Sequence, residues 1–147
     1  MFLYKNGKFQ IGNAEFKVPD GFYFSMNPEE VYDEELFLYA PNRNYSVSLR
    51  REEYTADTLL EIMEAETAGE MRIVKPLQPI SCNGLKGYCQ IFEENRYQYF
   101  EICLLLDDEY RYFVFEVTVA RNKDNIENVM NDSDFKEIFE SIGPADT

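Results

Sequence analysis

The sequence of 147 residues contains no histidine. It therefore lacks the side chain that most often serves as a general base, a proton shuttle or a zinc ligand. Catalytic arrangements of the Ser-His-Asp and Cys-His types are excluded for the same reason. The phosphate-binding patterns GxGxxG and GxxxxGK[ST] do not occur either, so no nucleotide cofactor is indicated.

Cysteine is scarce, and its three copies are Cys82, Cys89 and Cys103. An odd number leaves at least one thiol unpaired, and the spacing does not match a CxxC redox or zinc motif. We expect three reduced thiols that act as small buried apolar groups in a cytosolic protein. The acidic stretches at 122–127 and 131–134 lack the DxDxDG spacing of a calcium loop and are better explained as helix caps. We therefore expect folding without a metal or another cofactor.

Long apolar runs are missing as well. No segment approaches the roughly 20 apolar residues of a membrane span. Met1 leads almost directly into the polar residues 5–8, without the apolar stretch of a signal peptide. A cytoplasmic location is the prediction.

Basic residues are outnumbered, because 14 Lys and Arg stand against 28 Asp and Glu and give a formal net charge of −14. Such a charge repels phosphate, so binding to nucleic acid or to an anionic membrane is disfavoured. It favours basic proteins, basic peptides and cations as partners, or it simply keeps the protein soluble. The sequence leaves the oligomeric state open.

Apolar residues are abundant. Hydrophobic residues make up 45% of the chain and aromatic residues 16%, with 12 Phe and 11 Tyr. This suffices for a core, since a domain of about 150 residues buries roughly 70% of the surface of its unfolded chain. No repeat, low-complexity segment or linker divides the sequence, and we expect a single domain over residues 1–147.

Alternating apolar residues and turn signals predict a β-sheet. The expected strands are a hairpin within 8–18, then 22–26, 36–40, 45–50, 87–93, 97–106 and 112–120. The last three form an antiparallel meander.

Helical periodicity is clearest near the end of the chain. Helices are expected at 55–71, near 124–130 and from 133 to the Gly143-Pro144 stop. In the last of these, Phe135, Ile138 and Phe139 should dock the helix onto the sheet.

The meander has a definite predicted register. Either of two turn lengths pairs Leu106 with Arg111, and a slip by one residue would turn apolar side chains toward the wrong surface. The core face then pairs Leu104 with Phe113, Ile102 with Phe115 and Phe100 with Val117. The other face pairs Glu101 with Glu116.

The candidate partner-binding residues share this second face of the meander: Tyr97, Tyr99, Glu101, Tyr112 and Glu116. Like charges directly opposite one another cost on the order of 0.2 to 1 kcal/mol, so something should compensate them. One hypothesis is an Arg or Lys from a covering helix or a neighbouring strand. The other is that Glu101 and Glu116, flanked by Tyr99 and Tyr112, accept a cationic group of a partner.

Three short segments carry a resemblance to a known family: residues 16–22 (FKVPDGF), 83–87 (NGLKG) and 139–142 (FESI). With the order of elements, they make the chain resemble the Mog/PsbP-like superfamily, including its bacterial DcrB-like branch. The resemblance covers almost the whole chain. It implies an α+β fold in which a central antiparallel sheet of about six or seven strands has helices packed on both faces, an α/β/α sandwich.

Proteins on that fold are mostly binders, among them a photosystem subunit, a Ran-binding import factor, lipoproteins and adaptor chaperones of type VI secretion. No functional motif of theirs transfers residue by residue to this chain. We expect a non-catalytic intracellular adaptor or chaperone-like module that holds a protein or peptide on the tyrosine-bearing sheet face.

Two alternatives remain beside this function. The first is an acidic neutralising protein of the immunity type for a basic partner, and steep loss of affinity at high salt would favour it over apolar capture. The second, an outsider, is a hydrolase with a carboxylate pair assembled across the fold.

Overall fold

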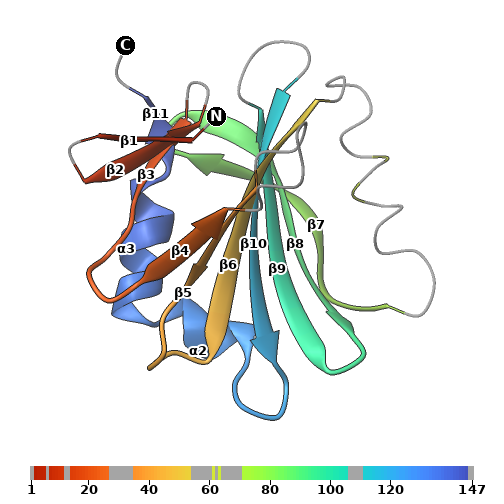
Figure 1. Ribbon diagram of the computed structural model, residues 1–147. Coiled ribbons are helices and arrows are strands. Elements are labelled where there is room, and N and C mark those ends of the chain that lie inside the picture. The colour runs from red at the N-terminus through yellow and green to blue at the C-terminus, as the bar shows by residue number, and fades with distance from the viewer. Residues whose placement is uncertain are drawn as a thin grey trace.

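The computed structural model describes residues 2–5, 7–11, 14–26, 35–53, 61, 63, 71–105 and 111–145. Its main element is a seven-stranded antiparallel sheet (Figure 1). In spatial order the strands are β4 (Tyr23–Met26), β5 (Glu35–Tyr39), β6 (Tyr45–Glu53), β10 (Arg111–Ala120), β9 (Tyr97–Leu105), β8 (Leu85–Glu94) and β7 (Arg72–Cys82).

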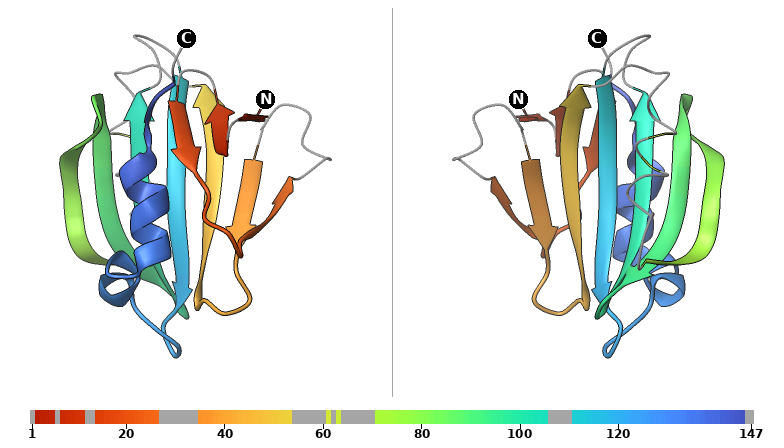
Figure 2. Two further views of the ribbon diagram at one scale, coloured as in Figure 1. Left: turned by 90° about the vertical axis from the view of Figure 1, so that its left-hand side faces the viewer. Right: turned by 90° about the vertical axis from the view of Figure 1, so that its right-hand side faces the viewer.

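The other described elements are two helices and a smaller, four-stranded sheet. The small sheet has the order β1 (Phe2–Lys5), β2 (Lys8–Ile11), β3 (Ala14–Lys17) and β11 (Gly143–Pro144). The helices are α2 (Ile126–Met130) and α3 (Ser133–Ser141), and both lie on one face of the large sheet (Figure 2). We call this the front face and the opposite one the reverse face.

The expected sheet-rich α+β fold and its strand number are confirmed, but the expected layering is not. The two helices with described bounds, α2 and α3, both cover the front face, so the prediction of helices packed on both faces, an α/β/α sandwich, is wrong for these two. The helix predicted at 55–71 lies outside the described residues except at Glu61, Met63 and residue 71, and the first two are helical. Met63 is fully buried against the reverse-face residues Cys103 and Val114.

β7 was not predicted, and its sequence explains why. It contains Pro76 and Pro79, which lack the N–H that a central strand must donate. The structure places β7 at the border of the sheet, where one side needs no partner. Its pairing with β8 also shifts register twice, between Ile73 and Lys75 and between Lys75 and Gln78. Irregular pairing of this kind removes the alternation by which a strand is predicted.

The register of the meander is confirmed. β9 and β10 pair Leu104 with Phe113, Ile102 with Phe115, Phe100 with Val117 and Glu101 with Glu116. On β6, Tyr45, Val47 and Leu49 are buried in the same core, as their alternation indicated. Parity within each strand therefore assigned the inward residues correctly.

Docking of α3 on the front face is also confirmed. Phe135 is 1% exposed and Ile138 is fully buried, while Phe139 is half-buried. The Phe135 ring lies 5.7 Å from that of Phe139 in a stacked geometry, and both rings contact Phe100 and Phe115 of the sheet. This aromatic cluster holds the helix against the centre of the large sheet.

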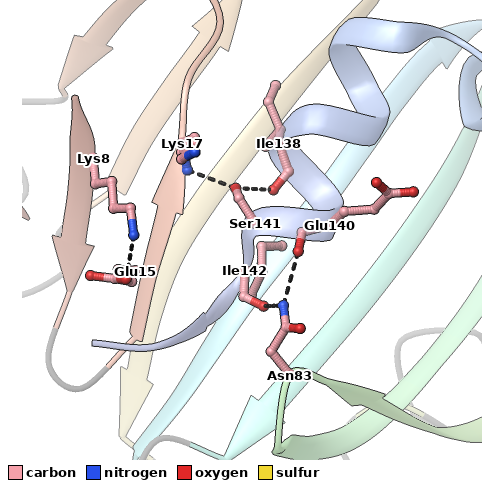
Figure 3. Close-up of polar contacts among 8 residues, drawn as sticks. All are labelled: Lys8, Glu15, Lys17, Asn83, Ile138, Glu140, Ser141 and Ile142. Atoms are coloured by element: carbon pink, nitrogen blue, oxygen red, sulfur yellow. Dashed lines mark hydrogen bonds and ion pairs between the residues drawn. The ribbon is translucent and has the colours of Figure 1, made fainter. Parts of the chain in front are cut away.

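The C-terminal end of α3 joins the small sheet to the β7–β8 turn (Figure 3). The Lys17 backbone N–H donates to the Ser141 hydroxyl over 2.7 Å, and that hydroxyl donates to the Ile138 carbonyl. The Asn83 side-chain amide donates to the carbonyls of Glu140 and Ile142 over 2.9 and 2.7 Å. Carbonyls at the end of a helix lack helical partners, so these bonds satisfy groups that would otherwise be orphaned.

The N-terminal end of α3 is held by Asp132. One carboxylate oxygen accepts hydrogen bonds from the Phe135 N–H (3.1 Å) and the Tyr45 hydroxyl (2.8 Å), and the other lies 3.4 Å from Arg43 Nε. Arg43 Nη2 also donates to Asp134 over 2.6 Å. The pKa of the Tyr45 hydroxyl is raised by burial and by this hydrogen bond to Asp132. A single carboxylate therefore caps α3 and ties it to the β5–β6 turn.

We expect Asp132→Ala to lower the free energy of unfolding by about 1 to 2 kcal/mol, because it removes an N-cap acceptor. Asp134→Ala is the matched control: it removes a partly exposed ion pair, with a cost of about 0 to 1 kcal/mol. Urea titration of both variants measures the difference. Equal losses would contradict the capping role of Asp132.

Candidate functional site

The five predicted site residues belong to two paired strands of the large sheet. Tyr97, Tyr99 and Glu101 come from β9, and Tyr112 and Glu116 come from β10. Alternation along each strand and the observed pairing put Tyr97, Tyr99, Glu101 and Glu116 on the reverse face. The side chain of Tyr112 lies outside what the structure describes.

Glu101 is buried rather than displayed. It is 1% exposed and accepts a 3.0 Å hydrogen bond from the Gln90 amide, which is itself buried and also donates to the Met63 carbonyl. The Gln90 amide thus offsets part of the repulsion between Glu101 and Glu116, a role for which one hypothesis from the sequence was an Arg or Lys. A partner on this face would have to displace this network to contact Glu101, so we do not include Glu101 in the accessible surface.

Tyr97, Tyr99 and Glu116 remain accessible to different degrees. Tyr97 is 45% exposed, whereas Tyr99 and Glu116 are half-buried. The pKa of Tyr99 is raised by burial first, and then by the carboxylates of Glu116 and Glu94. The tyrosine ring therefore lies in a region of negative potential.

Phe92 completes a group that we call the β9 aromatic cluster, consisting of Phe92, Tyr97 and Tyr99. Phe92 lies opposite Tyr99 on β8, and the two rings stack with centroids 5.0 Å apart. Tyr97 contacts Tyr99 at 6.3 Å. Buried Phe92 thus supports the more accessible tyrosine rings from one side.

A second aromatic group on the reverse face was missed by the sequence reasoning. This β5 aromatic cluster consists of Tyr23, Phe37 and Tyr39, which are 56%, 37% and 46% exposed. Tyr23 stacks on Tyr39 with centroids 5.6 Å apart. The alternation of Phe37 and Tyr39 with buried Leu36 and Leu38 was a signal that could have revealed it.

Small hydroxyl side chains separate the two clusters. Ser46 and Ser48 of β6 lie between β5 and β10, opposite Thr118 and Glu116. β5 and β9 are three strand spacings apart, which is about 14 Å at the usual distance between strands. The reverse face therefore presents aromatic rings on both sides of a strip that offers hydroxyl groups and one carboxylate.

The side chains on this surface can supply several kinds of contact to a partner. Tyrosine rings offer apolar area, hydrogen bonding and attraction for cations, and they lose little side-chain freedom on contact. Within the described chain, no group of three or more potential ligands is arranged to hold a metal ion. Burial raises the pKa of Cys82 to about 11 and raises that of Cys89, so neither thiol is an activated nucleophile.

A cavity of about 460 Å³ lies between β7 and α2, with Ile91 and Ile126 among its lining residues. The buried Gln98 amide in its lining already has hydrogen-bond partners within the protein. Its Oε1 accepts from the Ile126 N–H over 2.6 Å, and its Nε2 donates to Glu93 over 3.1 Å. The Gln98 amide therefore holds α2 against β9.

Comparison with known proteins supports the fold and goes no further. No family model and no curated protein matches the sequence. A crystal structure of a protein from Bacteroides thetaiotaomicron aligns with 90% of this chain at a TM-score of 0.52 and 10% identity. This chain spans 45% of the length of that protein. Among the described residues, no helix is long and apolar enough to cross a membrane.

Proposed function

We propose that the protein is a non-catalytic binding module, adaptor or chaperone-like, that holds a protein or peptide partner on the reverse face of its large sheet. The observation that carries this proposal is the pair of aromatic clusters with exposed Tyr23, Tyr39 and Tyr97. Exposed large apolar residues gathered on one face mark interaction sites, and tyrosine is enriched in them.

The partner would lie across the hydroxyl strip. Apolar groups of the partner would contact the rings, while its polar groups would meet Ser46, Ser48 and Thr118. The net charge of −14 and the carboxylates near Tyr99 would draw basic partners and speed their association. Affinity would come from burial of the rings, and selectivity from the charge.

Site-specific photocrosslinking tests the proposal. A benzophenone amino acid would replace Tyr39 or Tyr97 on the reverse face, and Glu137 on the exposed side of α3 as the matched control. We expect one protein adduct, identified by mass spectrometry, from both reverse-face positions and none from Glu137. Adducts of equal yield from all three positions, or from Glu137 alone, would contradict the proposal.

Salt dependence of the same crosslinks separates the main proposal from its alternative. Yields that persist at high ionic strength would support apolar capture by an adaptor. A steep fall would instead favour an acidic neutralising protein for a basic partner, since exposed charge pairs are screened by salt. We also retain two proposals, a cytoplasmic location and kinship with the Mog/PsbP-like superfamily. The antiparallel meander and the C-terminal helix support the kinship.

A further inference from the structure

The two borders of the large sheet differ in how well they are protected. β7 at one border contains two prolines and two register irregularities. Prolines and bulges are devices that prevent an edge strand from pairing with another chain, because they remove donors and twist the edge away. β7 is therefore a poor template for a further strand.

β4 at the other border lacks these devices. Its residues, Tyr-Phe-Ser-Met, include no proline and no charge. It is the last described strand on that side, and Figure 2 shows it at the outer margin of the sheet. Tyr23 is 56% exposed and Phe24 is 55% exposed. Because neighbouring residues of a strand point to opposite faces, this border is open on both faces.

We propose that β4 accepts an extended segment of a basic protein as an eighth strand of the large sheet. The proposal rests on the proposed function for the existence of such a partner, and it specifies how the partner is held. An edge strand offers a row of backbone donors and acceptors, so an added strand gains main-chain hydrogen bonds along β4.

The two faces of β4 predict the side chains of that segment. On the reverse face the segment would meet Tyr23, whose ring stacks on Tyr39 and which suits a Lys or Arg side chain. On the front face it would meet Phe24, whose ring contacts Phe9 at 5.1 Å and which suits an apolar side chain. The segment should therefore alternate basic with apolar residues.

Charge favours a basic partner over a second copy of this chain. The eight residues between β4 and β5 in the sequence, 27–34, include four acids and no base. Two copies would each bring a net charge of −14 and would repel one another. A basic segment gains from the same charge.

The test uses a fluorescent peptide of four Lys-Val repeats, titrated into the protein and followed by anisotropy. Two control peptides accompany it: one with four Glu-Val repeats, and one of unchanged charge whose four central backbone nitrogens are methylated. We expect saturable binding of the first alone, with amide shifts in NMR spectra confined to β4 and β5. Equal binding of the methylated peptide, or shifts centred on β7, would overturn the proposal.

Matched protein variants provide the second readout. Tyr23→Lys on β4 should weaken binding of the Lys-Val peptide at least tenfold, whereas Ile73→Lys makes the same charge change on β7 and should leave binding unchanged. If Tyr23→Lys has no effect while crosslinks from Tyr97 persist, strand addition fails and the proposed function stands. If sedimentation shows dimers that Tyr23→Lys dissociates, a second copy occupies β4 and the proposal is also wrong.

Discussion

Replacing Gly87 with alanine should lower the free energy of unfolding by about 3 kcal/mol or more. A Cβ atom at this position would overlap the carbonyl oxygen of Cys103 and lie 2.9 Å from the Leu104 Cα atom on β9. These are backbone atoms of the paired strand, so relief requires β8 and β9 to separate at the end of their ladder where Gly87 lies opposite Leu104. Urea titration monitored by circular dichroism would measure the loss.

Gly84→Ala is the matched control for this steric explanation. Gly84 lies in the same hairpin with a φ of +97°, and a Cβ there would meet no atom within 4 Å. The change should cost only the roughly 1 to 2 kcal/mol of a left-handed conformation. If Gly87→Ala were no more destabilising than Gly84→Ala, close strand approach would not be the reason for glycine at position 87.

Truncation of Phe135 to alanine should cost about 3 to 5 kcal/mol, the usual range for a large-to-small change of a buried aromatic residue. Phe135 is 1% exposed and lies between α3 and the sheet, in contact with Tyr45, Phe100, Phe115 and Phe139. Its removal leaves a cavity that these rings cannot fill without moving. Denaturant titration would report the loss as a lower midpoint.

Phe139→Ala serves as the comparison, because both residues belong to α3 and stack on one another. Phe139 is half-buried, and its truncation should therefore cost less than that of Phe135. The sequence pattern had treated the two as equivalent members of one apolar stripe. If Phe139→Ala lowered the free energy of unfolding more than Phe135→Ala does, the observed burial would not explain the relative importance of the two positions.

The sequence was informative where structure depends on local alternation. The parity of β9 and β10 set the pairing of Glu101 with Glu116, since a shift by one residue would expose Ile102 and Phe115. The same reasoning placed Tyr97 and Tyr99 on the face opposite the core. Helical spacing in α3 likewise identified Phe135 and Ile138 as docking residues.

It was uninformative where strands distant in the sequence meet. Tyr23 and Tyr39 reach the same face as Tyr97 and Tyr99 because β5, β6, β10 and β9 are neighbours, and no local pattern states that order. The burial of Glu101 beneath Gln90 and Met63 likewise depends on contacts between separate segments. A linear pattern shows which side a residue faces, but not what covers it.

The sequence by itself therefore determined the residue types and their sidedness: a histidine-free, strongly acidic chain, an antiparallel sheet, and a tyrosine-bearing face. Only the tertiary structure decided which of those side chains are accessible, which border of the sheet is open, and that Glu101 is internal. The physical reason is that sidedness follows from the two-residue period of a strand. Burial and edge position instead depend on which strands become neighbours, and that choice is made by packing of the whole chain.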